Sequence, residues 1–396
     1  MARARSVALV ALGLFLGGCS STSAPAEPDG LPAAPVSVSA ATAFSAPGPY
    51  TAGVVVKTTA EGDPVVVTYP VDKGSTAGKP AYTVNLVRWF LGDPAAPVPP
   101  GFASLHLPTT LATSAYGSVP ISAEGPFPVV LFSHGFGGYP EQSSFLTVHL
   151  ATWGFVVVAP DHRSRDLHAV VSGTVQACTC DVTDLDQALA YVTTLDHTHG
   201  SFLAGKLDLH RVASLGHSAG GGAAIAVASN PGVRAYIGLA PVPAPVPPAG
   251  KPGMLVQGLA DAVVAPSGTL ALYDTLQAPK RLVLIAGAGH NVFDDACTLG
   301  TGSGGLGALV HLLNLPAAFA AIATDGCAAP DVYPPTAWPL IDHVVTAQLR
   351  WALGIDPVPV GLAPGIDRSF AGVTATVSSA ASAPAIPTTV PTTTAG

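Results

Sequence analysis

Charged residues are scarce in this chain. Only 10% of its 396 residues are charged, and 16 Lys and Arg stand against 24 Asp and Glu, a net charge of −8. A chain without a surplus of basic residues lacks the electrostatic footprint of nucleic-acid binding, so we expect no nucleic-acid partner. The 48% hydrophobic content argues against a wholly disordered chain, and the length suits one large domain or two ordinary ones.

The N-terminal hydrophobic run, residues 7–16, is too short to span a bilayer as a helix. Arg3 and Arg5 precede it, which is typical of a secretory signal. It ends in Leu16-Gly17-Gly18-Cys19, which resembles the lipobox of bacterial lipoproteins. That resemblance implies acylation of Cys19 after cleavage and a protein anchored in the bacterial cell envelope, facing outside the cytoplasm. An ordinary secretory signal with a chance cysteine is the alternative.

Composition divides the rest of the chain. Residues 20–49 are rich in Ser, Ala, Pro and Thr, which predicts a disordered tether after the signal of residues 1–19. Residues 373–396 have a similar composition and are expected to form a disordered tail. The folded domain is therefore predicted at 50–372, without internal repeats.

Within that domain, apolar runs alternate with helical patterns, which predicts an α/β fold with a mostly parallel sheet covered on both faces. We expect strands at 54–57, 64–69, 128–133, 155–160, 211–216, 234–240, 253–258 and 281–286. We expect helices at 142–153, 182–195, 219–229, 267–276 and 338–353. Residues 81–116 read as an irregular excursion over the active-site rim. Ligands of such sheets bind at the carboxyl ends of the strands.

A complete G-x-S-x-G motif, Gly216-His217-Ser218-Ala219-Gly220, separates one of these strands from the following helix. A strand that turns into a helix within one residue strains that residue, and small neighbours avoid a clash. The motif therefore predicts Ser218 as a nucleophile at the tip of the turn, next to a helix N-terminus that favours negative charge. A glycine-rich turn that happens to contain serine is the alternative.

Asp261 and His290 follow two later strands, so the chain order is Ser218, Asp261, His290, the order of the α/β-hydrolase triad. Histidine can take the serine proton near neutral pH, and a carboxylate holds its tautomer. Asp261 could instead be a turn-forming residue, and His290 an exposed loop histidine. Asp294 and Asp295 are the runner-up acids.

The first central strand runs into His134-Gly135-Phe136-Gly137-Gly138, whose glycines allow backbone N–H groups to face the site. We predict an oxyanion hole formed by the N–H groups of Phe136 and Ala219. His134 is expected to brace this loop, and His162 to lie near the mouth of the site.

The chain has five cysteines. With Cys19 assigned to the lipobox, Cys178, Cys180, Cys297 and Cys327 allow three pairings, which fits an oxidising compartment. We favour a Cys297–Cys327 disulfide, which would join the loop after His290 to the segment before the last helix. The C-x-C with His197 and His199 could bind a metal, but exposed histidines are the favoured interpretation. We expect no cofactor and no metal.

These motifs together carry a family resemblance. FSHGFGG, LATWGFVVVAPDHR, DLDQALAYV, GHSAGGG, GLADAVV and GAGH resemble bacterial α/β-hydrolases described as predicted dienelactone hydrolases. They are also similar to platelet-activating-factor acetylhydrolases and to cutinase-like polyester hydrolases, over roughly residues 54–353. Dienelactone hydrolases use cysteine where this chain has Ser218. Polyester hydrolases usually have methionine where Ala219 stands and a tryptophan in a loop that has none here, which argues against polyester cleavage.

The resemblance and the motifs lead to one prediction, a monomeric serine esterase that acts on a small-molecule or lipid ester through an acyl-enzyme. A lipase or lipid-acetyl hydrolase is the nearest alternative. A non-catalytic envelope lipoprotein that retains the hydrolase fold is the alternative of a different class.

Overall fold

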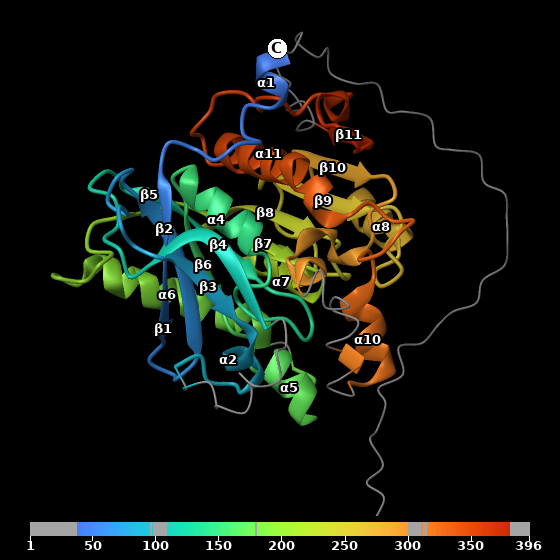
Figure 1. Cartoon of the computed structure of the whole chain (residues 1–396). Helices are drawn as coiled ribbons and strands as arrows, with labels where there is room; N and C mark the ends of the chain where they lie inside the picture. Colours follow the sequence, from blue (N-terminus) through green and yellow to red (C-terminus); the bar gives the residue numbers. More distant parts are fainter. Residues whose placement is uncertain are drawn as a thin grey trace, which may run out of the picture. The chain divides into compact units, whose positions relative to one another are not determined.

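The computed structural model describes residues 38–95, 97, 109–178, 180–299, 310–311 and 315–380. The strands of these residues form one sheet of eleven strands in the order β11-β10-β9-β8-β7-β5-β6-β2-β1-β4-β3 (Figure 1). Their bounds are β1 Thr51–Thr58, β2 Pro64–Val71, β3 Ala81–Asn85, β4 Thr110–Gly117, β5 Phe127–Ser133, β6 Val156–Pro160, β7 Leu207–His217, β8 Val233–Leu239, β9 Gly253–Gly258, β10 Lys280–Ile285 and β11 Ala375–Ala380.

The centre of the sheet is parallel, from β10 through β9, β8, β7 and β5 to β6. Strands β5, β6 and β9 are buried at every residue, as the uninterrupted apolar runs in the sequence indicate. The outer strands β2, β3 and β11 pair antiparallel with their neighbours. The predicted mostly parallel sheet of an α/β-hydrolase fold is confirmed.

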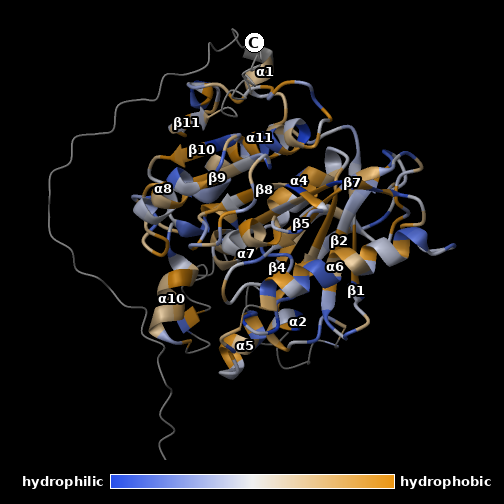
Figure 2. Cartoon of the chain, turned by 180° about the vertical axis from the view of Figure 1, so that it is seen from behind, coloured by the Kyte–Doolittle hydropathy of each residue, from blue (hydrophilic) through white to orange (hydrophobic). Residues whose placement is uncertain are grey.

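Helices cover both faces of this sheet. Helices α4 (Ser144–Thr152) and α11 (Pro334–Ala352) pack on one face, and α6 (Cys180–His197), α7 (Ala219–Val227) and α8 (Pro266–Thr275) pack on the other. In α6 the buried residues are Leu185, Ala188 and Val192, at the spacing of one helical face. Figure 2 shows the result, a helix that carries both blue and orange residues against largely orange strands.

The stretch 81–116 is not the predicted irregular excursion. Its described residues form strand β3 at the edge of the sheet, the short helix α2 (Leu86–Phe90) and strand β4, which lies between β3 and β1. The Asn85 side chain accepts a hydrogen bond from the Val87 N–H (3.1 Å) and so caps α2. In β4 only one residue is fully buried, which is why its mixed polarity did not resemble a strand.

The predicted start of the domain at Tyr50 is also wrong. Residues before it form helix α1 (Val38–Ala41) and a turn, in which Phe44 is only 6% exposed. The Phe44 ring meets the Trp153 ring edge-on at 4.9 Å and stacks with His343 at 5.7 Å. One buried aromatic residue therefore fixes a segment whose composition indicated a tether. The remainder of the tether and the signal lie outside the described residues.

At the other end, the predicted boundary at 372 is too early. Strand β11 pairs antiparallel with β10 from Ala375 to Ala380 and closes that edge of the sheet. Its inward side chains include the buried Ala375 and Val377. The small Ala and Ser residues conceal the alternation of a strand in the sequence.

Five further helical elements of the described residues were not predicted. These are helix α5 (Leu167–Ser172), helix α10 (Ala317–Thr324) and the short 3-10 helices η1 (His290–Phe293), η2 (Ala296–Thr298) and η3 (Ile366–Ser369). Among the described residues, no helix combines the length and the apolar character needed to cross a membrane.

Candidate active site

The turn between β7 and α7 holds Ser218 in the strained backbone conformation that the sequence predicts. Its φ is +59° and its ψ is −120°, a region that side-chain-bearing residues rarely occupy. The turn closes because Gly216 and Gly220, two residues to either side of Ser218, lack side chains. A Cβ on Gly216 would overlap the Gly220 carbonyl, and one on Gly220 would overlap the Ser133 carbonyl. The hydroxyl of Ser218 therefore stands at the carboxyl end of a central strand, at a helix N-terminus.

Asp261 and His290 form a buried pair after the neighbouring strands β9 and β10. The distance between His290 Nδ1 and Asp261 Oδ2 is 2.9 Å, and the two residues are 1% and 5% exposed. An ionised carboxylate only accepts, so His290 Nδ1 carries the proton and Nε2 keeps its free lone pair. A histidine in this tautomer can act as a general base.

The runner-up acids have other partners. Asp294 Oδ2 lies 3.7 Å from His217 Nδ1, and Asp295 Oδ2 accepts a hydrogen bond from the Ser144 N–H (2.6 Å) at the start of α4. Burial raises the pKa of Asp294 well above its usual range and that of Asp295 to about 7. The geometry therefore favours Asp261 as the partner of His290.

Three backbone N–H groups of the loop after β5 donate to acceptors within the protein. Gly135 N–H donates to Gln142 Oε1 (2.9 Å), Gly137 N–H to the Arg165 carbonyl (2.8 Å) and Gly138 N–H to the Gly135 carbonyl (3.1 Å). Within the described part of the chain, Phe136 N–H has no such acceptor. Ala219 N–H opens helix α7, where the first N–H groups have no intrahelical acceptor. These are the two donors that the sequence predicts for the oxyanion hole.

The family model described as "PETase: PET hydrolase-like" matches residues 106–304, just over half of the chain. The chain belongs to the PET hydrolase-like family. At the level of the family, the predicted resemblance to the polyester-hydrolase group of α/β-hydrolases is confirmed.

Two relatives outside the family model are also informative. This PET hydrolase-like chain is 28% identical over 154 residues to a platelet-activating factor acetylhydrolase of Cavia porcellus, over 28% of its own length. The match spans only 35% of that relative. The solved structure of a ferulic acid esterase from Streptomyces cinnamoneus is 21% identical, with a TM-score of 0.56. The likeness covers 84% of this chain and 98% of that one, and it shows the shared fold.

In this PET hydrolase-like chain, Ser218 and His290 line one cavity of about 120 Å³. Its walls come from segments that the sequence did not identify as structured, including α2, α10 and the residues around Leu299. They are mostly apolar, with Leu86, Phe90, Phe319 and Ile322 among them. The pocket thus offers an apolar surface next to the Ser218 hydroxyl.

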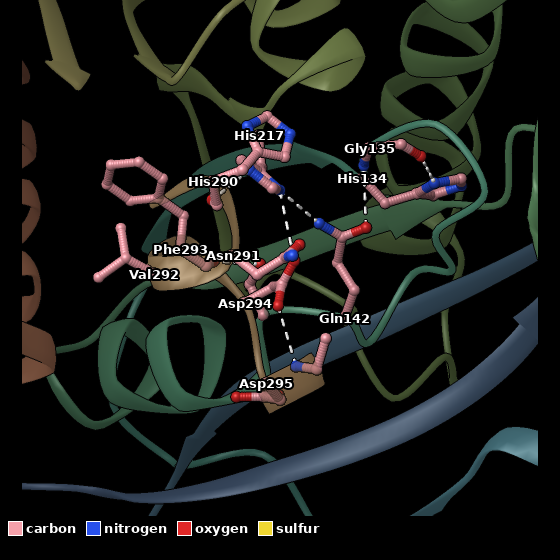
Figure 3. A network of polar contacts seen from close by, with 12 residues as sticks. His134, Gly135, Gln142, His217, His290, Asn291, Val292, Phe293, Asp294 and Asp295 are labelled. Carbon is pink, nitrogen blue, oxygen red and sulfur yellow. Dashed lines mark hydrogen bonds and ion pairs between the residues drawn. The ribbon is translucent and has the colours of Figure 1, made fainter. Parts of the chain in front are cut away.

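Four polar residues around the pair were missed from the sequence. Gln142 and His217 lie between the oxyanion loop, residues 134–138, and His290 (Figure 3). Asp325, at the end of α10, accepts a hydrogen bond from the His290 N–H (2.6 Å). Gln257 Nε2 donates to Asp261 Oδ2 (3.1 Å). Only the position of His217 inside the G-x-S-x-G motif could have singled it out.

His134 braces the loop, as predicted, but His162 does not lie at the mouth of the site. Both are fully buried, and the His162 N–H donates to His134 Nε2 (3.0 Å). Burial lowers the pKa of His134 to about 3 and holds the pKa of His162 well below its usual range. Both rings are therefore neutral supports behind the loop.

One group of described residues has the arrangement of metal ligands, namely His162, Asp181 and Asp184. Arg165 Nε donates to Asp181 Oδ2 (2.8 Å), and His162 Nδ1 lies 2.8 Å from Asp184 Oδ2. The Arg165 guanidinium thus supplies the positive charge of this cluster, which we interpret as an ion-pair network.

The favoured disulfide is confirmed. Cys297 and Cys327 are joined, with their Cα atoms 4.9 Å apart. Cys178 and Cys180 form a second disulfide, so their thiols are not available as metal ligands beside His197 and His199. The first disulfide connects η2, next to the His290 loop, to the segment that follows α10.

Proposed function

We propose that this chain is a serine-dependent carboxylic ester hydrolase with Ser218 as nucleophile, His290 as general base and Asp261 as the residue that orients the histidine. The observation that carries the proposal is the buried Asp261–His290 pair lining the same apolar pocket as the strained Ser218.

The chemistry follows from the tautomer of His290. Nε2 takes the Ser218 hydroxyl proton as Oγ attacks the ester carbonyl carbon, and the imidazolium is stabilised by Asp261. The carbonyl oxygen becomes an oxyanion that accepts from the N–H groups of Phe136 and Ala219. Nε2 then returns the proton to the departing alcohol. A water molecule that gives its proton to Nε2 then attacks the acyl-enzyme in the same way, and the carboxylic acid is released from Ser218.

The pocket supports an uncharged, apolar ester as substrate. Its walls are mostly aliphatic and aromatic, and the acid among the lining residues, Asp294, is neutral because burial raises its pKa well above the usual range. A charged acyl group would lose its hydration there without gaining a partner. The platelet-activating factor acetylhydrolase relative supports a lipid acyl ester as the second candidate.

Replacement of the nucleophile tests the proposal. Ser218→Ala should reduce hydrolysis of p-nitrophenyl acetate by about 10⁴-fold or more. It should also remove labelling by a fluorophosphonate probe, while circular dichroism remains unchanged. Full turnover by Ser218→Ala would contradict the proposal, and absence of turnover in the wild type would favour a non-catalytic protein with this fold. A series of p-nitrophenyl esters of increasing length measures the acyl preference.

We further propose that the chain is a lipoprotein of the bacterial cell envelope, anchored through Cys19. The positive Arg3 and Arg5, the short apolar run and the lipobox-like Leu16-Gly17-Gly18-Cys19 support this location. Two acyl chains give durable anchoring where one is marginal. Metabolic labelling with a palmitate analogue and partition into detergent should both be lost in Cys19→Ala. Retention of both in that variant would contradict the proposal.

A further inference from the structure

The side-chain amide of Gln142 lies between two loops of the proposed site. Gln142 is 5% exposed and precedes helix α4. Its Oε1 accepts from the Gly135 N–H of the oxyanion loop (2.9 Å), and its Nε2 donates to His217 Nδ1 of the nucleophile turn (2.9 Å). Figure 3 shows the amide reaching to both partners. Because one partner is a donor and the other an acceptor, the orientation of the amide is fixed.

His217 continues this chain of hydrogen bonds to the third loop. With Nδ1 accepting from Gln142, its Nε2 carries the proton and donates to the His290 carbonyl (3.1 Å). The rings of His217 and His290 lie 4.6 Å apart. Burial holds the pKa of His217 well below its usual range, so this neutral tautomer persists near neutral pH. The oxyanion loop, the turn around Ser218 and the loop of His290 are thereby joined by successive hydrogen bonds.

The oxyanion loop is shaped to admit the Gln142 side chain. A Cβ on Gly138 would overlap Gln142 Oε1, so the amide would have to move if Gly138 carried a side chain. On the other side, Arg165 Nη1 donates to the carbonyls of His134 (2.8 Å) and Gly135 (2.6 Å). Besides its ion pair with Asp181, Arg165 bonds to the oxyanion loop and, among the described residues, to neither the turn around Ser218 nor the loop of His290. In contrast, Gln142 links that loop to the nucleophile turn.

We propose that Gln142, acting through His217, is a positioning residue that sets the two oxyanion donors in register with each other and with the catalytic histidine. The inference rests on the proposed function. One donor, Phe136 N–H, lies next to Gly135, and the other, Ala219 N–H, lies two residues after His217. The amide of Gln142 is the bridge between them, so its loss should weaken binding of the transition state more than binding of the substrate.

Gln142→Ala is the first test, measured with p-nitrophenyl acetate and with an alkyl boronic acid, which forms a tetrahedral adduct on the serine. We expect kcat to fall about 10- to 100-fold, at most the lower end of the loss of about 10²- to 10³-fold seen when an oxyanion donor is removed, and KM to change less than about 3-fold. The inhibition constant of the boronic acid should rise by about the same factor as kcat/KM falls. The backbone carbonyl of Gln142 still accepts from the Asp295 N–H (2.7 Å), which keeps the loops attached in the variant.

Gln142→Glu gives a second test that a merely structural role would not pass. The introduced carboxylate and His217 Nδ1 are both acceptors. The carboxyl group can therefore bond to both the Gly135 N–H and His217 Nδ1 only when a proton is added between the carboxylate and His217. Turnover of Gln142→Glu relative to Gln142→Ala should therefore rise as pH falls from about 9 to about 6. The groups that face His217 are His290 and Asp294, with Arg165 across the loop. All three are present in both variants, so their own titration cancels in the ratio.

Thr147→Val is the matched control. Thr147 is equally buried on α4, but it lines a separate small cavity against β1, β2 and β4. We expect its kcat, KM and boronic acid inhibition within about 2-fold of wild type. Normal kcat in Gln142→Ala, or lower kcat with unchanged boronic acid inhibition, would overturn the positioning role. A ratio of the two Gln142 variants that does not change with pH would also overturn it. These outcomes leave the proposed function intact if Ser218→Ala is inactive.

Discussion

Asp261 uses both carboxylate oxygens. Oδ1 accepts from the N–H groups of Val263 (2.8 Å) and Val264 (2.7 Å), which makes a local turn, and Oδ2 accepts from Gln257 and His290. The two interpretations of this residue, turn former and partner of the histidine, are thus both realised in one side chain. The turn fixes the carboxylate so that its other oxygen faces the imidazole.

Asp261→Asn tests this arrangement at the scale of one residue. An amide can present an N–H to His290 Nδ1, which then favours the tautomer whose Nε2 carries the proton and cannot act as a base. We expect kcat to fall by about 10³- to 10⁴-fold, with a much smaller change in KM. Steady-state kinetics on p-nitrophenyl esters measure both.

The matched control is Asp294→Asn. Since burial keeps the Asp294 carboxyl neutral, the amide resembles the native group in charge and size. We expect its kcat within a few-fold of wild type. A larger loss in Asp294→Asn than in Asp261→Asn would show that the runner-up acid is the true partner.

At the scale of the element, helix α10 forms a wall of the pocket and is fixed at its end rather than along its length. It has no fully buried residue, although Phe319 and Ile322 line the pocket. Its C-terminal turn is held by Asn291 Nδ2, which donates to the carbonyls of Ile322 (2.8 Å) and Asp325 (2.9 Å), and by the Cys297–Cys327 disulfide. The wall therefore depends on covalent and polar contacts more than on burial.

The double variant Cys297→Ser/Cys327→Ser should be less stable by about 3–4 kcal/mol, as expected for a closed loop of 30 residues. Urea unfolding at equilibrium measures this difference. We also expect a larger KM for apolar esters, because α10 forms part of the pocket. Cys178→Ser/Cys180→Ser is the control, since that disulfide spans only two residues and should contribute far less. Equal losses in the two double variants would contradict this assignment.

The segment before β1 shows how a short peptide can belong to the folded unit. Besides the packing of Phe44, Trp153 Nε1 donates to the Ala46 carbonyl (3.0 Å), and the Gly48 N–H donates to Thr152 Oγ1 (2.8 Å). These contacts join the segment to the end of α4 and to α11. It is a structural part of the domain, remote from Ser218 in the sequence.

A chain that begins at Tyr50 should therefore be less stable than one that begins at Val38. Loss of a buried phenylalanine side chain alone costs about 3–5 kcal/mol, which sets the expected difference in the free energy of unfolding. Urea unfolding of the two chains measures it, and Phe44→Ala in the longer chain should reproduce most of the loss. If the shorter chain were equally stable, the contacts of Phe44 would contribute nothing to the folded state.

For the whole molecule, buried neutral histidines make stability depend on pH. His343 Nδ1 accepts from the Phe44 N–H (3.1 Å), and burial lowers the pKa of His343 from its ordinary value of 6.5 to about 4. Between these values the unfolded chain binds a proton that the folded chain does not. The contribution of neutral His343 to the free energy of unfolding is thus fully present above about pH 6.5 and is lost as pH falls toward 4.

From this shift we expect His343 to cost about 2 kcal/mol of stability between pH 7 and pH 5. The free energy of unfolding in urea, measured at both pH values, should fall more in the wild type than in His343→Gln. Asp161 and Asp184, whose pKa burial raises to about 7, act in the opposite sense, but they are common to both proteins. An identical pH dependence in the two proteins would refute the role of His343.

The centre of the sheet and the candidate reactive residues at the ends of its strands can be predicted from local patterns in the chain. Parallel strands that are buried on both faces are apolar at nearly every position, so uninterrupted apolar runs predict β5, β6 and β9. The G-x-S-x-G turn can be predicted because the steric constraint on it involves only neighbouring residues. Strand, strained residue and helix are consecutive, and the glycines that avoid the clash must lie beside Ser218.

The residues that support the site and the limits of the domain depend on contacts between segments far apart in the chain. Gln142 and His217 are 75 residues apart along the chain, and Phe44 and His343 are 299 residues apart. A local sequence pattern therefore cannot predict either contact. Strand β11 exists because β10 offers it an unpaired edge, and a chain of small residues can take that place as readily as it can stay unstructured. A hydrogen bond or a ring contact requires only that two groups meet, and the fold alone determines which groups do.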